Sequence, residues 1–459
     1  MSAVEIAARI ASGSLSAREA VESHLARIGA ENSKYNAVVT LAAEQALEAA
    51  DAADRQLAAG EPVGPLHGVP VLHKDLQPTK GIRTTFGSRL FQDFVPDTDS
   101  LLVERLKAAG AITLGKTNTP EFGAGSQTFN AVFGKTLNPW DTTKTCGGST
   151  GGGAVALATG MTPLADGSDL GGSLRNPASF CGVVGLRPTA GRVPAWPIRF
   201  PWLPLSVEGP MARSVSDLAL FCSAITGYDP RAPLSFEDNT DFAAPLGRDL
   251  RGTRVAWWTG LGGIPVDKRV RDITEAQRTV FESLGCIVEE AEPDLFGADE
   301  AFRTLRTWMT ETALGDSVRA HPALFKDTIH WEIERAAQLT ARDVGLAHLR
   351  LAEIQDRMRR FMERNDFFVL PVSQVPPFDV NLPFPMEVDG VRMETYIDWM
   401  KSCYLISVTG APALSVPAGF TPEGLPVGIQ IVGGHRKERA LLEMGHAFEQ
   451  AVGITRRLI

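Results

Sequence analysis

Two glycine-rich segments, each with one serine inside it, are the part of this sequence best suited to chemistry. The first is TCGGSTGGGAVALATG (145–160), with Ser149, and the second is GSDLGGSLRNPASFCGVVGLRPT (167–189), with Ser173. Glycine is favoured where the backbone takes a positive φ or where a ligand approaches the main chain. The first segment runs into an alanine-rich stretch, so its free N–H groups should lie at a helix N-terminus that favours an anion. Serine hydroxyls beside bare backbone amides are the setting that an oxyanion hole requires.

Three other interpretations of these segments have to be weighed. A phosphate-binding loop is disfavoured, because GxxxxGK[ST] is absent and no GxGxxG properly follows a strand. The residues GGSTG (147–151) also match the G-x-S-x-G nucleophile elbow of α/β-hydrolases. In such an esterase Ser149 would be the nucleophile, with a late histidine, His435 or His446, as its partner. The glycines would otherwise only allow close packing of helix on sheet, but two serine-bearing clusters so close together weaken that interpretation.

Lys74 adds a third reactive group upstream, in the segment GVPVLHKDL at the end of a predicted apolar strand. A lone lysine is usually a solvated surface residue. With this lysine included, the chain resembles the amidase signature family of serine hydrolases. That family combines a lysine in a V-K-D-type segment with a G-G-S-S-G-G cluster and then G-x-D-x-G-G-S-x-R-x-P. Lys74 lies 75 residues before Ser149, and Ser149 lies 24 before Ser173, as in the family. Further matching segments are GKTNTPEFGAGSQ, NPW, GLRPT, GPMARSVSDLAL and GAPALSVPAG with GLPVGIQIVGG.

The resemblance implies a role for each of these residues. Ser173 is the nucleophile, Ser149 bridges it to the base, and Lys74 is the base. The peptide bond between Gly148 and Ser149 is implied to be cis. The oxyanion hole is implied to consist of backbone N–H groups, which belong to Asp169, Leu170, Gly171, Gly172 and Ser173. The resemblance implies no metal and no organic cofactor.

A buried lysine is chemically suited to the implied role. Serine is a weak nucleophile and needs a base that removes its proton during attack on a carbonyl. Lysine can be that base only when neutral, and burial lowers its pKa from about 10.4 because it disfavours the ammonium. A serine hydroxyl donates and accepts hydrogen bonds, so Ser149 can relay the proton to Lys74. The same relay can return a proton to the leaving nitrogen of an amide.

Three positions depart from the common family pattern. Thr150 stands in place of a serine but keeps a hydroxyl for hydrogen bonding. Leu170 stands in place of a threonine or isoleucine, which matters little where only its backbone amide is used. His73 precedes the lysine where an apolar residue is common. It would either tune the pKa of the lysine or serve packing, and packing is the favoured interpretation.

The substrate class depends on weaker signals. The amidase subunit of a glutamyl-tRNA amidotransferase, which supplies ammonia to a partner subunit, normally carries a basic, tyrosine-rich stretch before the late amphipathic helix. The residues ALFKDTIHWEIERAAQLTARDV lack that pattern, which favours a stand-alone hydrolase. Trp196, Phe200 and Trp202 in the loop AWPIRFPWLPLSVEG are expected to border the substrate pocket. Such a pocket favours aryl amides and carbamates (urethanes), with esters also accepted. Gln127 is a further expected substrate contact.

Around these residues, helices alternate with short, continuously apolar strands. The alternation predicts an α/β fold with a central mixed, mostly covered β-sheet surrounded by helices. Ser16 with Glu19, and Thr340, mark predicted helix starts. The predicted strands include VPVL (69–72), AITLG (111–115), RVAWW (254–258), FFVL (367–370), LSVP (414–417) and VGIQIV (427–432).

Two proline-rich stretches, 194–210 and 371–385, are predicted to be long surface loops. Neither has the composition of a linker between domains. Residues 1–459 are therefore expected to form a single domain, with its signature core at about 65–215.

The composition excludes several protein classes. An apolar share of 44% fits a globular protein with a sizeable core, and a net charge of −9 gives no support to a nucleic-acid-binding surface. Five scattered cysteines without a CxxC pair predict reduced thiols in a cytoplasmic protein. Neither a signal peptide nor a membrane span is predicted. Together with the family resemblance, these features give a small-molecule amide, ester or carbamate as the expected partner, with no nucleic acid and no membrane, and a homodimer is left open.

Overall fold

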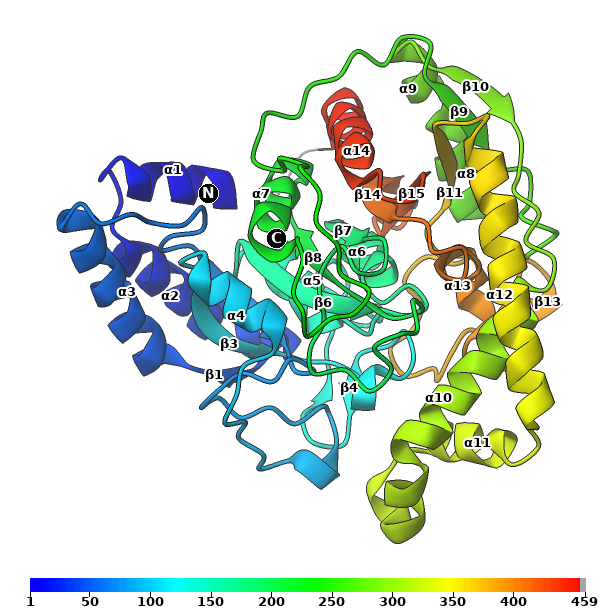
Figure 1. Ribbon diagram of the computed structural model, residues 1–459, viewed down its shortest axis with the longest axis horizontal. Coiled ribbons are helices and arrows are strands. Elements are labelled where there is room, and N and C mark those ends of the chain that lie inside the picture. Colours follow the sequence, from blue (N-terminus) through cyan, green and yellow to red (C-terminus); the bar gives the residue numbers. More distant parts are fainter. Residues whose placement is uncertain (455–459) are drawn as a thin grey trace.

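A mixed β-sheet runs through the computed structural model, which describes residues 1–454 (Figure 1). Within these residues eleven strands form the sheet. Their order is β1 (Val38–Leu41), β3 (Ile112–Thr117), β2 (Pro70–Lys74), β6 (Leu164–Asp169), β8 (Val207–Ala212), β7 (Val184–Arg187), β14 (Ala413–Phe420), β15 (Pro426–Gly433), β11 (Phe367–Pro371), β9 (Arg254–Trp257) and β10 (Ile287–Glu290). The strands β3, β2 and β6 run parallel, whereas β6, β8, β7, β14 and β15 pair antiparallel. The predicted strands are all present, and the sheet is mixed as expected.

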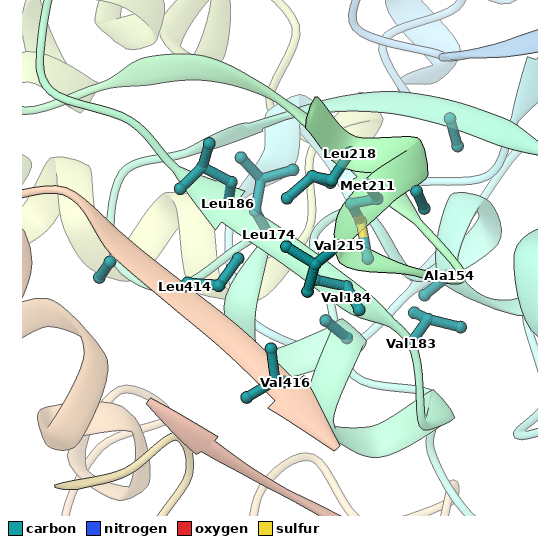
Figure 2. Close-up of a cluster of buried hydrophobic side chains, with 14 of the residues drawn as sticks. Ala154, Leu174, Val183, Val184, Leu186, Met211, Val215, Leu218, Leu414 and Val416 are labelled. Atoms are coloured by element: carbon teal, nitrogen blue, oxygen red, sulfur yellow. The ribbon is translucent and has the colours of Figure 1, made fainter. Parts of the chain in front are cut away.

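Helices cover both faces of the central strands. All eight residues of β15 and all five of β11 are buried, which requires cover on either face because neighbouring side chains point to opposite sides. Leu186 of β7, Met211 of β8 and Leu414 of β14 belong to one buried hydrophobic cluster with Leu218 of the helix at 215–225 (Figure 2). The chain therefore forms one α/β domain with a largely covered sheet.

Two helices begin at the N-cap residues that the sequence predicts. Ser16 and Thr340 are the N-caps of α2 and α12, and each forms the reciprocal capping-box hydrogen bonds. The first half of the chain contains α1 (Ala3–Ala11), α2 (Ala17–Tyr35), α3 (Ala43–Ala58), α4 (Leu101–Ala108), α5 (Gly151–Ala158), α6 (Arg175–Cys181) and α7 (Val215–Ile225). The second half contains α8 (Lys268–Ala276), α9 (Arg278–Ser283), α10 (Ala298–Ala320), α11 (Asp327–Ala336), α12 (Ala341–Met362), α13 (Lys401–Ser407) and α14 (Glu438–Val452). No helix in residues 1–454 is long and apolar enough to cross a membrane.

The helices α10, α11 and α12 form a separate layer beside the sheet (Figure 1). The helix α10 packs against both of the others and against α13, and its residues also line the cavity of the candidate site. Two short hairpins, β4 (Phe129–Asn130) with β5 (Gly134–Lys135) and β12 (Glu387–Val388) with β13 (Val391–Arg392), lie outside the main sheet.

The two proline-rich stretches are not entirely surface loops. Residues 207–210 of the first stretch belong to β8, which is paired on both sides and mostly buried. In the second, Pro371 ends β11 and residues 371–377 are all buried. A buried loop needs partners for its backbone. The carbonyl of Val372 accepts from Ser402 Oγ at 2.7 Å, and that of Gln374 accepts from the Asp267 N–H at 2.8 Å.

Candidate active site

The polar centre of the molecule lies where β2, β6 and β8 meet at one edge of the sheet. The strands β2 and β6 are parallel, so their carboxyl ends lie together, and the antiparallel β8 begins at the same edge. Lys74 is the last residue of β2 and is fully buried. Its Nζ donates to Ser149 Oγ at 2.7 Å and to Ser168 Oγ at 3.1 Å. The lysine is therefore held inside the protein by two hydroxyls and does not extend into solvent.

Ser149 lies just before α5, in a loop that glycines bring into close contact with its neighbours. The Gly148–Ser149 peptide bond is cis, as the family resemblance implies. A Cβ at Gly151 or Gly152 would overlap the Thr128 side chain or the Asn118 backbone. The packing role of these glycines is thus real, and it coexists with the placement of Ser149.

Ser173 lies in the loop between β6 and α6 and is 8% exposed. Its carbonyl accepts a hydrogen bond from the Thr150 N–H at 3.2 Å. This bond fastens the two serine-bearing segments to each other. Ser149 and Ser173 both line the same cavity.

A buried ion-pair cluster around Asp169 holds the Ser173 loop in shape. The Asp169 carboxylate accepts from Arg175 Nη2 at 2.8 Å, from Arg187 Nη1 at 3.2 Å and from the Gly172 N–H at 2.9 Å. Burial alone would raise the pKa of Asp169, but Arg175 and Arg187 hold it well below its ordinary value. The sequence motif implied only a backbone amide at Asp169, whereas its side chain organises the loop.

Two of the five amides expected in the oxyanion hole differ from the prediction. The Gly172 N–H already donates to Asp169 Oδ1, and Asp169 does not line the cavity. Leu170, Gly171 and Ser173 line the cavity, and their N–H groups have no acceptor among the described residues. These three amides are the ones geometrically available to a negative charge.

Burial and nearby carboxylates act in opposite directions on the lysine. Burial lowers the pKa of Lys74, while Glu208, Asp169 and Asp166 partly oppose that shift. Burial likewise raises the pKa of the Glu208 carboxyl, which lies at the start of β8. Both shifts favour the neutral forms, an amine and a carboxylic acid.

His73 contributes to the scaffold under the lysine. Its Nδ1 is hydrogen-bonded to Asp166 Oδ2, and its Nε2 lies 2.9 Å from Thr113 Oγ1. The other oxygen of Asp166 accepts the backbone N–H of Lys74 at 2.9 Å. This geometry agrees with the packing interpretation of His73, because both ring nitrogens are engaged away from the Lys74 amine.

Thr150 and the late histidines do not take part in the contacts expected of them. The Thr150 hydroxyl is buried and has no hydrogen-bond partner among residues 1–454, so the expected hydrogen-bonding role is not seen. His446 Nδ1 lies 3.4 Å from Ser216 Oγ, and His435 lines a different groove. None of the eight histidines of the chain, all of them described, lines the cavity with Ser149. The geometry thus gives the nucleophile elbow no histidine partner.

The cavity above the serines has a volume of about 780 Å³. Six phenylalanines line it together with aliphatic side chains and the charged Asp97, Arg199 and Arg306. Its polar end carries Ser149, Ser168, Ser173 and Glu208. Its aromatic wall residues are Phe86, Phe91, Phe94, Phe122, Phe200 and Phe302. Three of these come from the segment TTFGSRLFQDFV, whose repeated phenylalanines are a signal in the sequence that motif matching overlooks. The cavity can enclose an aryl group beside two serine hydroxyls.

Of the expected substrate contacts, only Phe200 lines this cavity. Trp202 is 73% exposed and Trp196 lies beneath the Arg231 guanidinium, 5.0 Å from its ring centre, and neither residue lines the cavity. The loop directs these two side chains elsewhere. Gln127 lies in a neighbouring pocket of about 280 Å³, where its amide donates to the Leu382 carbonyl at 3.0 Å.

The site combines a buried lysine, a serine hydrogen-bonded to it and a second serine on the same cavity, at the ends of strands in a large mixed α/β sheet. Comparison with known proteins identifies the family. The family model described as Amidase matches residues 19–442. The chain belongs to the amidase signature family of hydrolases.

Two relatives and one solved structure illustrate the range of this family. An acylamidase of Rhodococcus erythropolis is 36% identical over 98% of this chain and 95% of its own. The A subunit of the glutamyl-tRNA(Gln) amidotransferase of Halorhodospira halophila is also 36% identical, over 97% of this chain and 96% of its own. The crystal structure of a bacterial aryl acylamidase superposes with a TM-score of 0.93 at 30% identity, covering 98% of this chain and 96% of that one.

Proposed function

We propose that this enzyme is a stand-alone serine hydrolase that cleaves aryl amides and aryl carbamates, and also esters, through Ser173, Ser149 and Lys74. The observation that carries the proposal is the 2.7 Å contact between the buried Lys74 amine and Ser149, at the polar end of a cavity that also contains Ser173. The likeness to an acylamidase and to an aryl acylamidase supports the same substrate class.

The proposed reaction moves one proton along a short relay. Ser173 Oγ attacks the substrate carbonyl while Ser149 takes its proton and passes its own to the neutral amine of Lys74. The free N–H groups of Leu170, Gly171 and Ser173 stabilise the oxyanion. The proton then returns through Ser149 to the leaving nitrogen, because an amide anion is a poor leaving group. Water attacks the resulting acyl-enzyme with the relay reversed, and no metal or organic cofactor is needed.

The cavity supports aryl substrates in preference to small polar amides. Burying one aryl ring against its phenylalanines contributes roughly 1.5–3 kcal/mol, or about one to two decades in kcat/KM. A carbamate differs from an amide by one oxygen beside the attacked carbonyl, so the same groups can attack it. Loss of the amine then leaves a carbonate-type acyl-enzyme, which water converts to an alcohol and carbon dioxide.

Glutamine hydrolysis within a tRNA-dependent amidotransferase is the second candidate, because the A subunit of such a complex is as similar in sequence as the acylamidase. The aromatic cavity favours the first candidate. Glutamine carries an α-ammonium and an α-carboxylate, and both would lose hydration against the phenylalanines of the cavity. The arginines that line the cavity, Arg199 and Arg306, are already engaged by the Ala313 carbonyl and by Glu332.

Covalent labelling tests the proposed nucleophile directly. The protein is treated with an aryl fluorophosphonate, digested and mapped by mass spectrometry. The proposal expects a single phosphonyl adduct on Ser173. An adduct on Ser149 in its place would support the nucleophile elbow instead.

A further inference from the structure

Glu208 is an acidic residue inside the cavity that the proposed reaction does not use. It lies on β8 directly opposite Ser168 of β6 in the antiparallel register. Side chains directly opposite each other in such a pair lie on the same face with Cβ atoms about 4.5–5.5 Å apart. Ser168 Oγ in turn accepts a hydrogen bond from Lys74 Nζ at 3.1 Å. Glu208, Ser168 and Lys74 therefore form a row across β8, β6 and β2.

One side of the Glu208 carboxyl is fixed, and the other faces the cavity. Its Oε2 accepts a hydrogen bond from Gln77 Nε2. The backbone carbonyl of Gln77 accepts from the buried Lys116 Nζ, so the donor itself is anchored. Among the described residues Glu208 Oε1 has no hydrogen-bond partner, and Glu208 lines the cavity together with Ser149 and Ser173. An unpaired carboxylate is costly in a cavity with aromatic walls.

The other charged groups around Lys74 each have a partner of their own. Asp166 is hydrogen-bonded to His73, and Asp169 is paired with Arg175 and Arg187.

Asp75 and Lys116, the other ionisable groups near β2, are hydrogen-bonded as well. Asp75 is hydrogen-bonded to Thr85, and Lys116 donates to Gln77, Thr79 and Thr84. Arg199 and Arg306 line the same cavity, but they are engaged by the Ala313 carbonyl and by Glu332. Within residues 1–454, no lysine or arginine donates a hydrogen bond to Glu208.

We propose that Glu208 is a positioning residue whose charge sets the protonation state of Lys74 across Ser168. The inference rests on the proposed function, in which Lys74 acts as the base. An ionised Glu208 opposite Ser168 stabilises the ammonium of Lys74, whereas a protonated Glu208 removes that stabilisation and favours the neutral amine. The protonation of Glu208 therefore decides the pH at which Lys74 becomes a usable base.

A change of Glu208 to glutamine tests this through the pH profile. While ionised, Glu208 favours the ammonium of Lys74 and so raises the pH needed to reach the neutral amine. E208Q removes that charge and keeps an oxygen that can accept from Gln77. The acidic limb of kcat/KM for an aryl ester should then move down by about 1 pH unit or more and become a single-proton step. The wild type should show a broader rise, since two groups titrate together.

Glu208→Asp is the matched control, since it retains the carboxyl and should keep the midpoint of the limb close to that of the wild type. Gln77→Met leaves Glu208 in place but removes its N–H donor, which favours the protonated carboxyl and should also move the limb down. Fluorophosphonate labelling involves attack by the serine but no deacylation. Its rate over the same pH range therefore gives the acidic limb of the first step alone. Circular dichroism confirms that each variant is folded.

An acidic limb that stays in place in both E208Q and Gln77→Met, or that moves up in E208Q, overturns the proposal. Lys74→Ala separates this failure from that of the proposed function. If Lys74→Ala loses activity and its pH limb while E208Q leaves the limb unmoved, Lys74 is the base and only the role of Glu208 is wrong. If Lys74→Ala keeps the wild-type profile, the proposed function itself fails.

Discussion

At the scale of single residues, the two serines should differ sharply when each is removed. Ser173→Ala is expected to abolish both turnover and fluorophosphonate labelling, because no other group in the site forms the acyl-enzyme. Ser149→Ala should leave measurable activity, because water can occupy the space of its hydroxyl and connect Ser173 to Lys74. Rates and adduct mass, measured for both variants, check this. Labelling that persists in Ser173→Ala and disappears in Ser149→Ala contradicts the assignment.

The role of Lys74 as the base can be tested by changing the leaving group of the substrate. Lys74→Ala is expected to lower amide hydrolysis by about 10²–10⁴-fold and ester hydrolysis less, since alcohols depend less than amines on a returned proton. Burial lowers the pKa of Lys74, and only its neutral form accepts a proton. Activity should therefore rise with pH through a midpoint below the ordinary lysine value of about 10.4. Matched amide and ester substrates, assayed from pH 5 to 10, test both statements, and an unchanged profile in Lys74→Ala excludes the lysine.

The sequence predicts these three residues because short motifs mark them, and the structure places Lys74 against Ser149 and both serines on one cavity. The sequence does not predict that Glu208 lies there, because its position opposite Ser168 depends on the pairing of β6 with β8. For the same reason the sequence does not predict that the Gly172 N–H donates to the side chain of Asp169, three residues earlier. Contacts of this kind are set by tertiary geometry, which residue spacing does not encode.

At the scale of elements, the loop between β6 and α6 depends on one buried carboxylate. Asp169→Asn is expected to destabilise the protein by about 3–5 kcal/mol, because it leaves Arg175 and Arg187 buried without their anion. The folded-state pKa of Asp169 is lowered, so its stabilisation is complete above the unfolded-state value of about 3.9 and is lost as the pH falls below it. Urea unfolding at pH 7 and at pH 3–4 should show the gap between wild type and variant narrowing in acid. An equal gap at both pH values contradicts the argument.

The segment with Phe86, Phe91 and Phe94 forms the aromatic wall by packing its rings on one another, with centroids 5.2–6.1 Å apart. Phe94 is 41% exposed, so Phe94→Ala should cost little stability. It should lower kcat/KM for anilides by up to about tenfold and leave small aliphatic amides unaffected. Trp202→Ala is the matched control, because that ring lies outside the cavity and its removal should not change the ratio of kcat/KM for anilides to that for small aliphatic amides. If that ratio changes in Trp202→Ala and not in Phe94→Ala, the substrate lies against the loop that carries Trp202.

At the scale of the whole molecule, the alternation of helices and apolar strands was enough to predict an α/β fold with a covered, mixed sheet. The order of the eleven strands was not predictable, because neighbours such as β3 with β1 or β15 with β11 are separated in sequence by helices and loops. The sequence also does not predict in which direction the side chains of a loop point. Trp196, Phe200 and Trp202 share one segment, yet only Phe200 faces the cavity.

The isolated chain should act on aryl substrates without a partner subunit. In a panel of matched substrates with one acyl group, kcat/KM should fall by about one to two decades when the aryl ring of an anilide or aryl carbamate is replaced by a small alkyl group. An anilide gains further because it releases a weakly basic amine, which eases collapse of the tetrahedral intermediate. Glutamine should be a poor substrate, since its α-ammonium and α-carboxylate would face the phenylalanine wall. Comparison of kcat/KM for the anilide, the alkyl amide, the carbamate and glutamine on the same preparation decides between the two candidate functions. Preference for glutamine, or for a small amide such as malonamide, would show that the aromatic cavity does not select the substrate.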